Sequence, residues 1–285
     1  MNVEASYTWC AAVARKEAKN FYYSFLLLSK PQRRAMCAIY AFMRYCDDLS
    51  DDEGIADRAA AIGRWAEDLE SALAGVPPDH ALWPAFVDAV HRYKIPHQYF
   101  YDMIEGVSSD LEPRRVQTFE ELYDYCYHVA SVVGLTVIHI FGFEGEKALK
   151  LAEKCGVAFQ LTNILRDVRE DSGNGRVYLP AEDFKRFGVS AQTFEPHTDF
   201  LAMMEFEARR ARDYYFQSAP LVAMIDAPSR ASLRALIGIY ARLLDRIVAS
   251  DYDVLERRIR VPAWEKIALL VKARLPMGEI GPRPL

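Results

Sequence analysis

The sequence predicts an all-α fold in a single domain that covers residues 1–285. Apolar residues recur at the three- and four-residue spacing of helical faces, and the alternation typical of strands is scarce. Prolines interrupt the chain at intervals that suit helix starts and stops. Because no proline falls between Pro113 and Pro180, we expect the longest central helices there. No linker rich in Gly, Ser or Pro separates two parts of the chain.

Composition narrows the class of protein. Hydrophobic residues make up 51% of the 285 residues and charged residues 26%, which excludes a disordered or collagen-like chain. The net charge of -5 argues against a broad nucleic-acid-binding face. The five cysteines contain no C-x-x-C pair, so we expect neither a disulfide framework nor a zinc site, and a cytoplasmic location fits best. The polar N-terminus does not resemble a signal peptide.

Two segments carry a clear apolar helical face. One runs through residues 119–141, and the other runs through residues 233–247 with its arginines outside. The longest apolar stretch, from Val129 to Phe143, has 15 residues, which is too short to span a bilayer and predicts a buried helix. Gly134 lies inside it and serves either close helix packing or a break that opens a cavity.

A first row of acids ends a predicted helix. At about 100° per residue, one face of that helix holds Tyr40, Arg44, Asp47 and Asp51. Like charges one turn apart cost about 0.2–0.5 kcal/mol per pair. A bound divalent cation would reverse the sign of that interaction, whereas a fully solvated helix face would only tolerate it.

A second row of polar residues continues a stripe of small residues. One arc of about 80° holds Gln160, Asn163, Asp167 and Asp171. Gly156 lies on the same arc, so we expect the row to point inward. Because a buried carboxylate without a partner is costly, an inward row of this kind calls for a metal ion or facing cations.

Together, the two rows predict carboxylates on two helices that face each other, hold several Mg²⁺ ions and grip a diphosphate with arginines nearby. A solvated-face interpretation is the alternative for each row taken alone. A di-iron site would require a histidine three residues after a glutamate, and none of the six histidines is so placed. The glycine motifs of P-loop and Rossmann sites are absent.

Several longer segments together form a recognisable set of motifs. They read Y-A-F-M-R-Y-C-D-D-L-S-D at 40–51, D-M-I-E-G at 102–106, Y-C-Y-H-V-A-S-V-V-G-L at 125–135, Q-L-T-N-I-L-R-D-V-R-E-D at 160–171, R-V-Y-L-P at 176–180 and Y-x-x-L-L-D from Tyr240. The pattern covers residues 7–272 and resembles the squalene/phytoene synthase family, whose members join two prenyl diphosphates by their C1 carbons.

The resemblance implies an isoprenoid synthase helical bundle around a deep central cavity. By motif, it implies metal ligands at Asp47, Asp48, Asp51, Asn163, Asp167 and Asp171. It implies substrate contacts at Lys19, Asn20, Phe21, Tyr40, Arg44, Gln160, Arg166, Tyr240 and Arg257, with Tyr178 closing the site. The catalytic set is then Tyr40, Arg44, Asp47, Asp48, Asp51, Asp167 and Asp171.

Three short segments bear on the substrate. Some family members carry H-S-K-S-F where this chain has E-A-K-N-F at residues 17–21. The following F-Y-Y-S-F at 21–25 resembles bacterial presqualene diphosphate synthases, whereas Y-C-Y-H-V-A at 125–130 resembles phytoene synthases. The two signals therefore favour different products.

The leading expectation is Mg²⁺-dependent head-to-head condensation of two farnesyl diphosphates to presqualene diphosphate or a squalene-type C30 product. The alternative is phytoene synthesis from two geranylgeranyl diphosphates, and a remote one is a non-catalytic assembly factor of the same fold. NADPH has no support in the sequence. Because prenyl products partition into membranes, the bases in R-R-I-R at 257–260 and K-A-R at 272–274 are candidates for peripheral contact with the inner membrane surface. Solvated helix faces explain the same bases.

Overall fold

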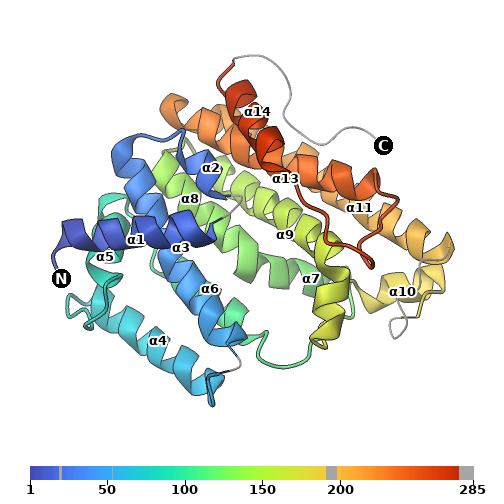
Figure 1. The fold of residues 1–285 in the computed structure, drawn as a ribbon, viewed down its shortest axis with the longest axis horizontal. Helices are drawn as coiled ribbons and strands as arrows, with labels where there is room; N and C mark the ends of the chain where they lie inside the picture. The colour runs from blue at the N-terminus through green and yellow to red at the C-terminus, as the bar shows by residue number, and fades with distance from the viewer. Residues whose placement is uncertain (19–20, 53, 191–197, 276–285) are drawn as a thin grey trace.

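The computed structural model describes residues 1–18, 21–52, 54–190 and 198–275, and it is helical throughout (Figure 1). Within that part of the chain no strand forms, and β-type pairing is limited to two isolated bridges. The helices are α1 (Val3–Glu17), α2 (Phe21–Phe25), α3 (Lys30–Asp51), α4 (Arg58–Leu73), α5 (Trp83–Arg92), α6 (Gln98–Ser108), α7 (Phe119–Cys126), α8 (Val132–Phe141), α9 (Lys147–Gly173), α10 (Ala181–Phe187), α11 (Thr198–Ser218), α12 (Leu221–Met224), α13 (Arg230–Val248) and α14 (Ala263–Ala273). The predicted all-α class is confirmed.

Helix α9 is the centre of the bundle. It is 27 residues long and packs against α7, α8, α11 and α13 (Figure 1). It falls in the proline-free stretch in which the sequence predicts the longest helices. Because α9 has helices on several sides, both its apolar residues and its polar row face protein or a cavity.

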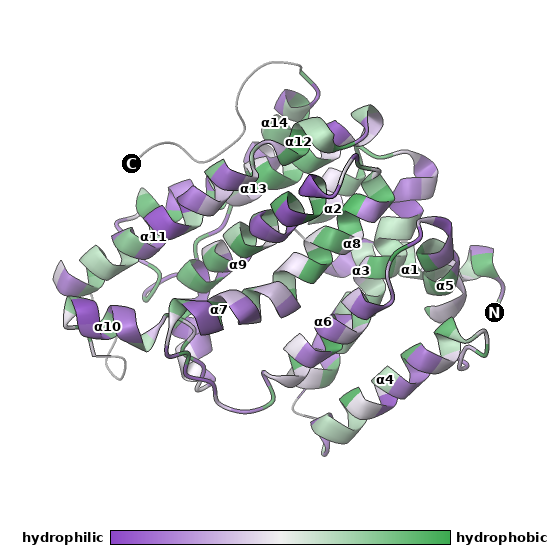
Figure 2. Ribbon diagram, turned by 180° about the vertical axis from the view of Figure 1, so that it is seen from behind, coloured by the Kyte–Doolittle hydropathy of each residue, from purple (hydrophilic) through white to green (hydrophobic). Residues whose placement is uncertain are grey.

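Residues 119–141 form one nearly continuous helical rod. A π-helical turn at Tyr127–Ser131 joins α7 to α8. The rod is long and apolar enough to cross a membrane by length and composition, but 56% of its most apolar window is buried among other helices. The predicted burial is confirmed for most of α8, which is hydrophobic along most of its length (Figure 2).

Two glycines allow the rod and α9 to approach closely. A Cβ on Gly156 would stand 2.5 Å from the Cα of Ser131, and one on Gly134 would stand 3.0 Å from the carbonyl oxygen of Ala152. Such distances are shorter than ordinary carbon contacts, so no larger residue fits without a backbone shift. Gly134 therefore serves close packing, and α8 continues through it without a break.

An aromatic core fixes the orientation of α3. Phe42 stacks on Phe86 with ring centroids 4.6 Å apart and also contacts Trp65, Trp83 and Phe100. Such pairs add about 0.5–1.5 kcal/mol each beyond simple burial. With this face of α3 buried against α4, α5 and α6, the face roughly opposite is turned toward α9 and α13.

Candidate active site

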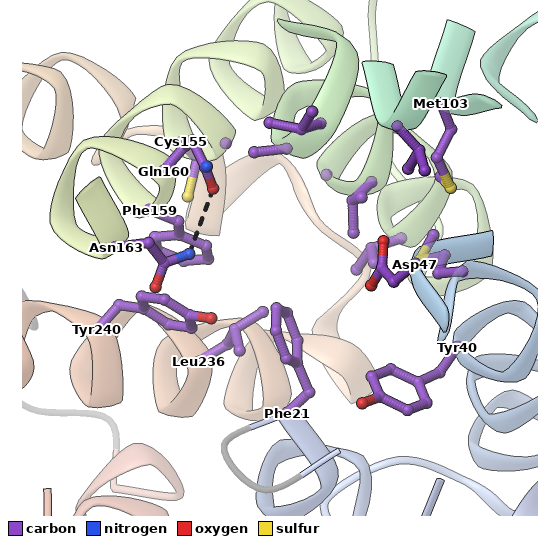
Figure 3. Close-up of a pocket in the computed structure, with 18 of the residues that line it drawn as sticks. Phe21, Tyr40, Asp47, Met103, Cys155, Phe159, Gln160, Asn163, Leu236 and Tyr240 are labelled. Atoms are coloured by element: carbon purple, nitrogen blue, oxygen red, sulfur yellow. Dashed lines mark hydrogen bonds between the residues drawn. The ribbon is translucent and has the colours of Figure 1, made fainter. Parts of the chain in front are cut away.

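A cavity of about 390 Å³ lies between α3, α8, α9 and α13. Its body is apolar, and its polar side chains come mainly from α3 and α9. Figure 3 shows Asp47 on one side of the open space and Gln160 and Asn163 on the other. The lining includes Phe21, Tyr40, Arg44, Asp47, Asp110, Tyr125, Gln160, Asn163, Asp167, Asp171, Arg176, Tyr178 and Tyr240.

The α3 wall contributes Tyr40, Arg44 and Asp47, which the sequence places on one helical face. The neighbouring Asp48 forms an ion pair with Arg44, keeps 52% of its side chain exposed and is not part of the lining. The structure therefore separates Asp47, which faces the cavity, from Asp48, which the sequence analysis grouped with the metal ligands. The physical reason is the rotation of about 100° between successive helical residues.

The α9 wall contributes the whole predicted polar row. Gln160, Asn163, Asp167 and Asp171 all line the cavity at successive turns. Asn163 donates a hydrogen bond of 3.3 Å from Nδ2 to Oε1 of Gln160, and the pair is drawn in Figure 3. The inward direction predicted from the small-residue stripe agrees with this placement.

Two arginines form ion pairs with Asp167. Arg166 donates from Nε at 2.8 Å, and Arg258 lies 3.1 Å from Oδ1 of the same carboxylate. Arg258 also pairs with Glu170 at 2.6 Å. Because Arg258 belongs to the loop before α14, these bonds fasten that loop to the polar end of α9.

The donor set on α9 suits a hard divalent cation. Oδ1 of Asn163 is buried and has no hydrogen-bond partner among the described residues. Burial, together with the negative charges of Asp167 and Glu170, raises the pKa of Asp171 to about 7. A cation between these oxygens would occupy the orphaned acceptor and offset the crowded charge.

The described residues contain no ready-made group of three or more His, Cys, Asp or Glu side chains around one point. Mg²⁺ fits such a site, since it is usually bound by one or two carboxylates and completed by water and phosphate oxygens. Asp47 on α3, with Asn163, Asp167 and Asp171 on α9, would hold the ions.

A second hydrogen-bonded group, centred on Asp110, also lines the cavity. The hydroxyls of Tyr125 and Tyr178 donate to Asp110 at 2.9 and 2.8 Å, and the two rings stack with centroids 4.6 Å apart. Arg176 donates to the backbone oxygen of Asp110 at 2.9 Å. Tyr178 is only 5% exposed, so it forms part of the closed wall.

The sequence predicts no role at this site for Asp110, Tyr125, Arg176 or Arg258. Tyr125 and Arg176 stood in the quoted segments Y-C-Y-H-V-A and R-V-Y-L-P, which offered a signal for them. Asp110 offered none, because its two tyrosine partners are 15 and 68 residues away along the chain.

Aromatic rings from α2, α3, α9 and α13 line another part of the cavity. Tyr240 stacks on Phe159 at 4.4 Å and meets the edge of Phe21 at 5.7 Å, and Phe21 lies 6.5 Å from Tyr40 (Figure 3). Burial raises the pKa of Tyr240 to about 12 and also raises the pKa of Tyr40. Both phenols are therefore neutral at ordinary pH.

The remaining predicted residues lie elsewhere or are not described. Arg257 is 66% exposed and pairs with Asp253 at 2.9 Å. Neither Arg257 nor Arg258 is part of the cavity lining, but Arg258 reaches the site through its contact with Asp167. Arg166 is buried and reaches the site through Asp167. Lys19, Asn20 and the side chain of Asp51 lie outside the described residues.

The helical bundle, its apolar cavity and the facing polar rows define an all-α prenyltransferase. The chain belongs to the squalene/phytoene synthase family, whose model matches residues 14–265. It is 37% identical over 290 residues to the 15-cis-phytoene synthase of Synechococcus elongatus, covering 96% of this chain and 94% of that protein. It is also 37% identical over 275 residues to the chloroplastic phytoene synthase 1 of Arabidopsis thaliana, covering 93% of this chain and 65% of that protein.

Solved structures are similar over nearly the whole chain. A dehydrosqualene synthase in complex with a ligand superposes with a TM-score of 0.89 at 29% identity, covering 95% of this chain and 96% of the other. A squalene synthase from Alicyclobacillus acidocaldarius superposes with a TM-score of 0.82 at 25% identity, covering 88% and 95%. The family resemblance and the isoprenoid synthase fold expected from the sequence are confirmed.

Proposed function

We propose that the chain is a Mg²⁺-dependent phytoene synthase that condenses two geranylgeranyl diphosphates head to head. The sequence analysis gave first place to farnesyl diphosphate and a C30 product. The relatives at 37% identity, which match over almost all of this chain, are named phytoene synthases and favour the alternative instead. The C30 synthases among the solved structures are less similar in sequence, at 25–29% identity.

One observation carries the proposal: polar rows from α3 and α9 line opposite sides of a cavity whose body is apolar. Diphosphate groups fit the polar rows, and prenyl chains fit the apolar body. A non-catalytic relative would have no need for Asp47, Asp167 and Asp171 to face the same cavity, so this arrangement favours an enzyme over the assembly-factor alternative.

The first chemical step is ionisation of one allylic diphosphate. The metal ions supply Lewis-acid stabilisation of the leaving diphosphate when they are bound. Asp47 and Asp167 would hold those ions, and Arg44 and Arg176 line the same cavity with positive charge that stabilises the developing anion. The arginines cannot be deprotonated at ordinary pH, so their contribution is constant.

The second step is attack on the allylic cation by the C2–C3 double bond of the second chain. The apolar lining limits water that would capture the cation early. The rings of Phe21, Tyr40 and Tyr240 stand at the cavity and can stabilise a nearby cation by about 0.5–2 kcal/mol each.

The third step closes the cyclopropane and requires a base. Because burial raises the pKa of Tyr40 and Tyr240, neutral phenols at these positions are poor bases. The released diphosphate is the better acceptor for the proton. A second ionisation and a final proton loss then give phytoene, and this sequence consumes no NADPH.

The test is to incubate the purified chain and Mg²⁺ with geranylgeranyl or farnesyl diphosphate, each with and without NADPH, and to identify products by mass. We expect a C40 hydrocarbon from geranylgeranyl diphosphate in both conditions and none when Mg²⁺ is chelated. Conversion of farnesyl diphosphate alone would contradict the substrate assignment. Consumption of neither substrate would contradict the enzymatic assignment.

A further inference from the structure

Helix α14 presents a row of large apolar side chains to solvent. Trp264 is 68% exposed, Ile267 54%, Val271 62% and Leu275, just beyond the helix, 56%. Residues three and four positions apart lie on one helical face, so these four form a continuous strip, called here the outer face of α14. Monomeric proteins rarely expose a contiguous apolar strip without a binding purpose.

The outward direction of this face is fixed by bonds on the opposite side of the helix. Glu265 is 7% exposed and accepts hydrogen bonds from Arg242 and Arg246 on α13. Hydrogen bonds from Arg242 lower the pKa of Glu265, so it stays ionised and bonded. Arg234 donates to the backbone oxygen of Ala273 at 2.9 Å. With both ends of α14 fastened to α13, rotation that would bury the strip is excluded.

Basic residues accompany the strip. Six bases and two acids lie between residues 256 and 275, although the whole chain carries a net charge of -5. One of the two acids is Glu265, which is taken up by α13. Arg260, Lys272 and Arg274 are exposed, whereas Arg257 and Arg258 pair with acids. An apolar row with lysines and arginines beside it matches the surface of an anionic bilayer in both hydrophobicity and charge.

The strip also lies close to the prenyl cavity. Helix α14 packs on α13 and α2, and these two helices supply Leu236, Phe21 and Phe25 to the cavity wall (Figure 1). Helices α2 and α13 therefore contact the cavity on one side and α14 on the other.

We propose that the outer face of α14 docks the protein on an anionic lipid bilayer. Trp264, Ile267, Val271 and Leu275 enter the boundary between headgroups and acyl chains, and Lys272 and Arg274 meet lipid phosphates. The docked protein places the α2–α13 wall of its cavity next to the membrane, where an apolar hydrocarbon product is soluble. The proposal concerns the surface and does not depend on which prenyl substrate the cavity accepts.

The test is flotation with vesicles of phosphatidylcholine alone or with a third of phosphatidylglycerol, at low and high salt. We expect binding to the anionic vesicles that weakens at high salt. The double variant Ile267→Glu/Val271→Glu should bind at least about tenfold more weakly. Val76→Glu, at another site that is 73% exposed, is the matched control and should bind as the unchanged protein does.

Tryptophan fluorescence gives a second readout. Trp264 is strongly exposed, Trp65 and Trp83 are buried and Trp9 is partly buried, so brominated acyl chains should quench mainly Trp264 on binding, and Trp264→Phe should remove most of that quenching. Condensation of detergent-dispersed substrate should be unchanged in the double variant, which separates this proposal from the proposed function. Equal vesicle binding by the double variant, or self-association of the unchanged protein through this face in place of vesicle binding, would overturn it.

Discussion

Two groups of acids lie in very different surroundings in this protein. The carboxylate rim, defined as Asp47, Asp167 and Asp171, lines the cavity. The buried acid cluster, defined as Asp183, Glu207 and Arg210, lies between α10 and α11, where Arg210 pairs with Asp183 at 2.9 Å and with Glu207 at 2.6 Å. Both groups combine carboxylates with arginine on helices.

The comparison shows that burial of an acidic side chain does not by itself identify a ligand-binding site. In the cluster, burial raises the pKa of Glu207 to about 8, and Arg210 pairs with both acids, so the cluster is satisfied without a ligand. At the rim, open space stands in front of the carboxylates and the neighbouring amide oxygen of Asn163 has no partner among the described residues. The rim therefore has both the space and the unpaired oxygen to bind a ligand, whereas the acids of the cluster are already paired with Arg210.

The largest expected effect comes from neutralising the rim. Asp167→Asn should lower kcat by on the order of 10³-fold or more, because it removes a metal ligand and a partner of two arginines. Asp48→Asn, which changes an exposed acid one position from Asp47, is the matched control and should retain most activity. Steady-state kinetics with circular dichroism as a check on folding would measure both. Near-normal turnover by Asp167→Asn would remove the rim from the mechanism.

Breaking the cluster should act on stability and leave the chemistry intact. Arg210→Ala should lower the free energy of unfolding by about 3 kcal/mol, because it leaves two buried acids without their cation. Arg209→Ala, whose partner Glu205 is on the surface, should cost less than about 1 kcal/mol. Urea denaturation measures both values. Loss of activity per folded molecule in Arg210→Ala would show that the cluster and the rim are not separable.

A smaller effect is expected for the arginine that fastens the loop before α14 to the rim. Arg258→Ala should reduce kcat/KM about tenfold, because Arg258 positions Asp167 and adds positive charge near it. Arg257→Ala should change little, since that side chain is exposed and paired with Asp253. The reverse order of effects would favour the assignment made from sequence over the one made from structure.

The smallest expected effect is a change in pH dependence from the cluster. Because the pKa of Glu207 is raised in the folded state, its contribution to stability is full below its ordinary pKa and is lost as pH rises through about 8. Asp183, Arg210 and Cys126 are the groups that act on it. Glu207→Gln should therefore flatten the decline of unfolding free energy between mildly acidic and mildly alkaline pH, by up to about 1.4 kcal/mol per pH unit. An unchanged slope in urea denaturation series would contradict this origin.

Much of the rim follows from the sequence because helical geometry is regular. The placement of Asn163, Asp167 and Asp171 on one inward face required only the rotation per residue and the stripe of small residues beside them. The same rotation turns Asp48 away from Asp47. The family resemblance grouped the two residues as metal ligands, whereas in the structure only Asp47 faces the cavity.

What the sequence could not supply was long-range geometry. Arg257 and Arg258 are adjacent in a loop without helical periodicity, so the pattern could not tell which one reaches Asp167. The bonds from Tyr125 and Tyr178 to Asp110 join three separate segments, and no local pattern records such a meeting. The exposed strip on α14 is visible as spacing in the sequence, but which face points outward depends on the bonds from α13 to Glu265.

The account rests most heavily on the claim that α3 and α9 hold metal ions and a diphosphate between them. The most direct measurement is a crystal structure with Mn²⁺ and a non-ionisable thiodiphosphate analogue, read by anomalous scattering. The account predicts manganese peaks within bonding distance of Asp47 and of Asp167, with the diphosphate between the two helices. Manganese bound only at outward acids such as Asp48, or a diphosphate outside the cavity, would contradict it.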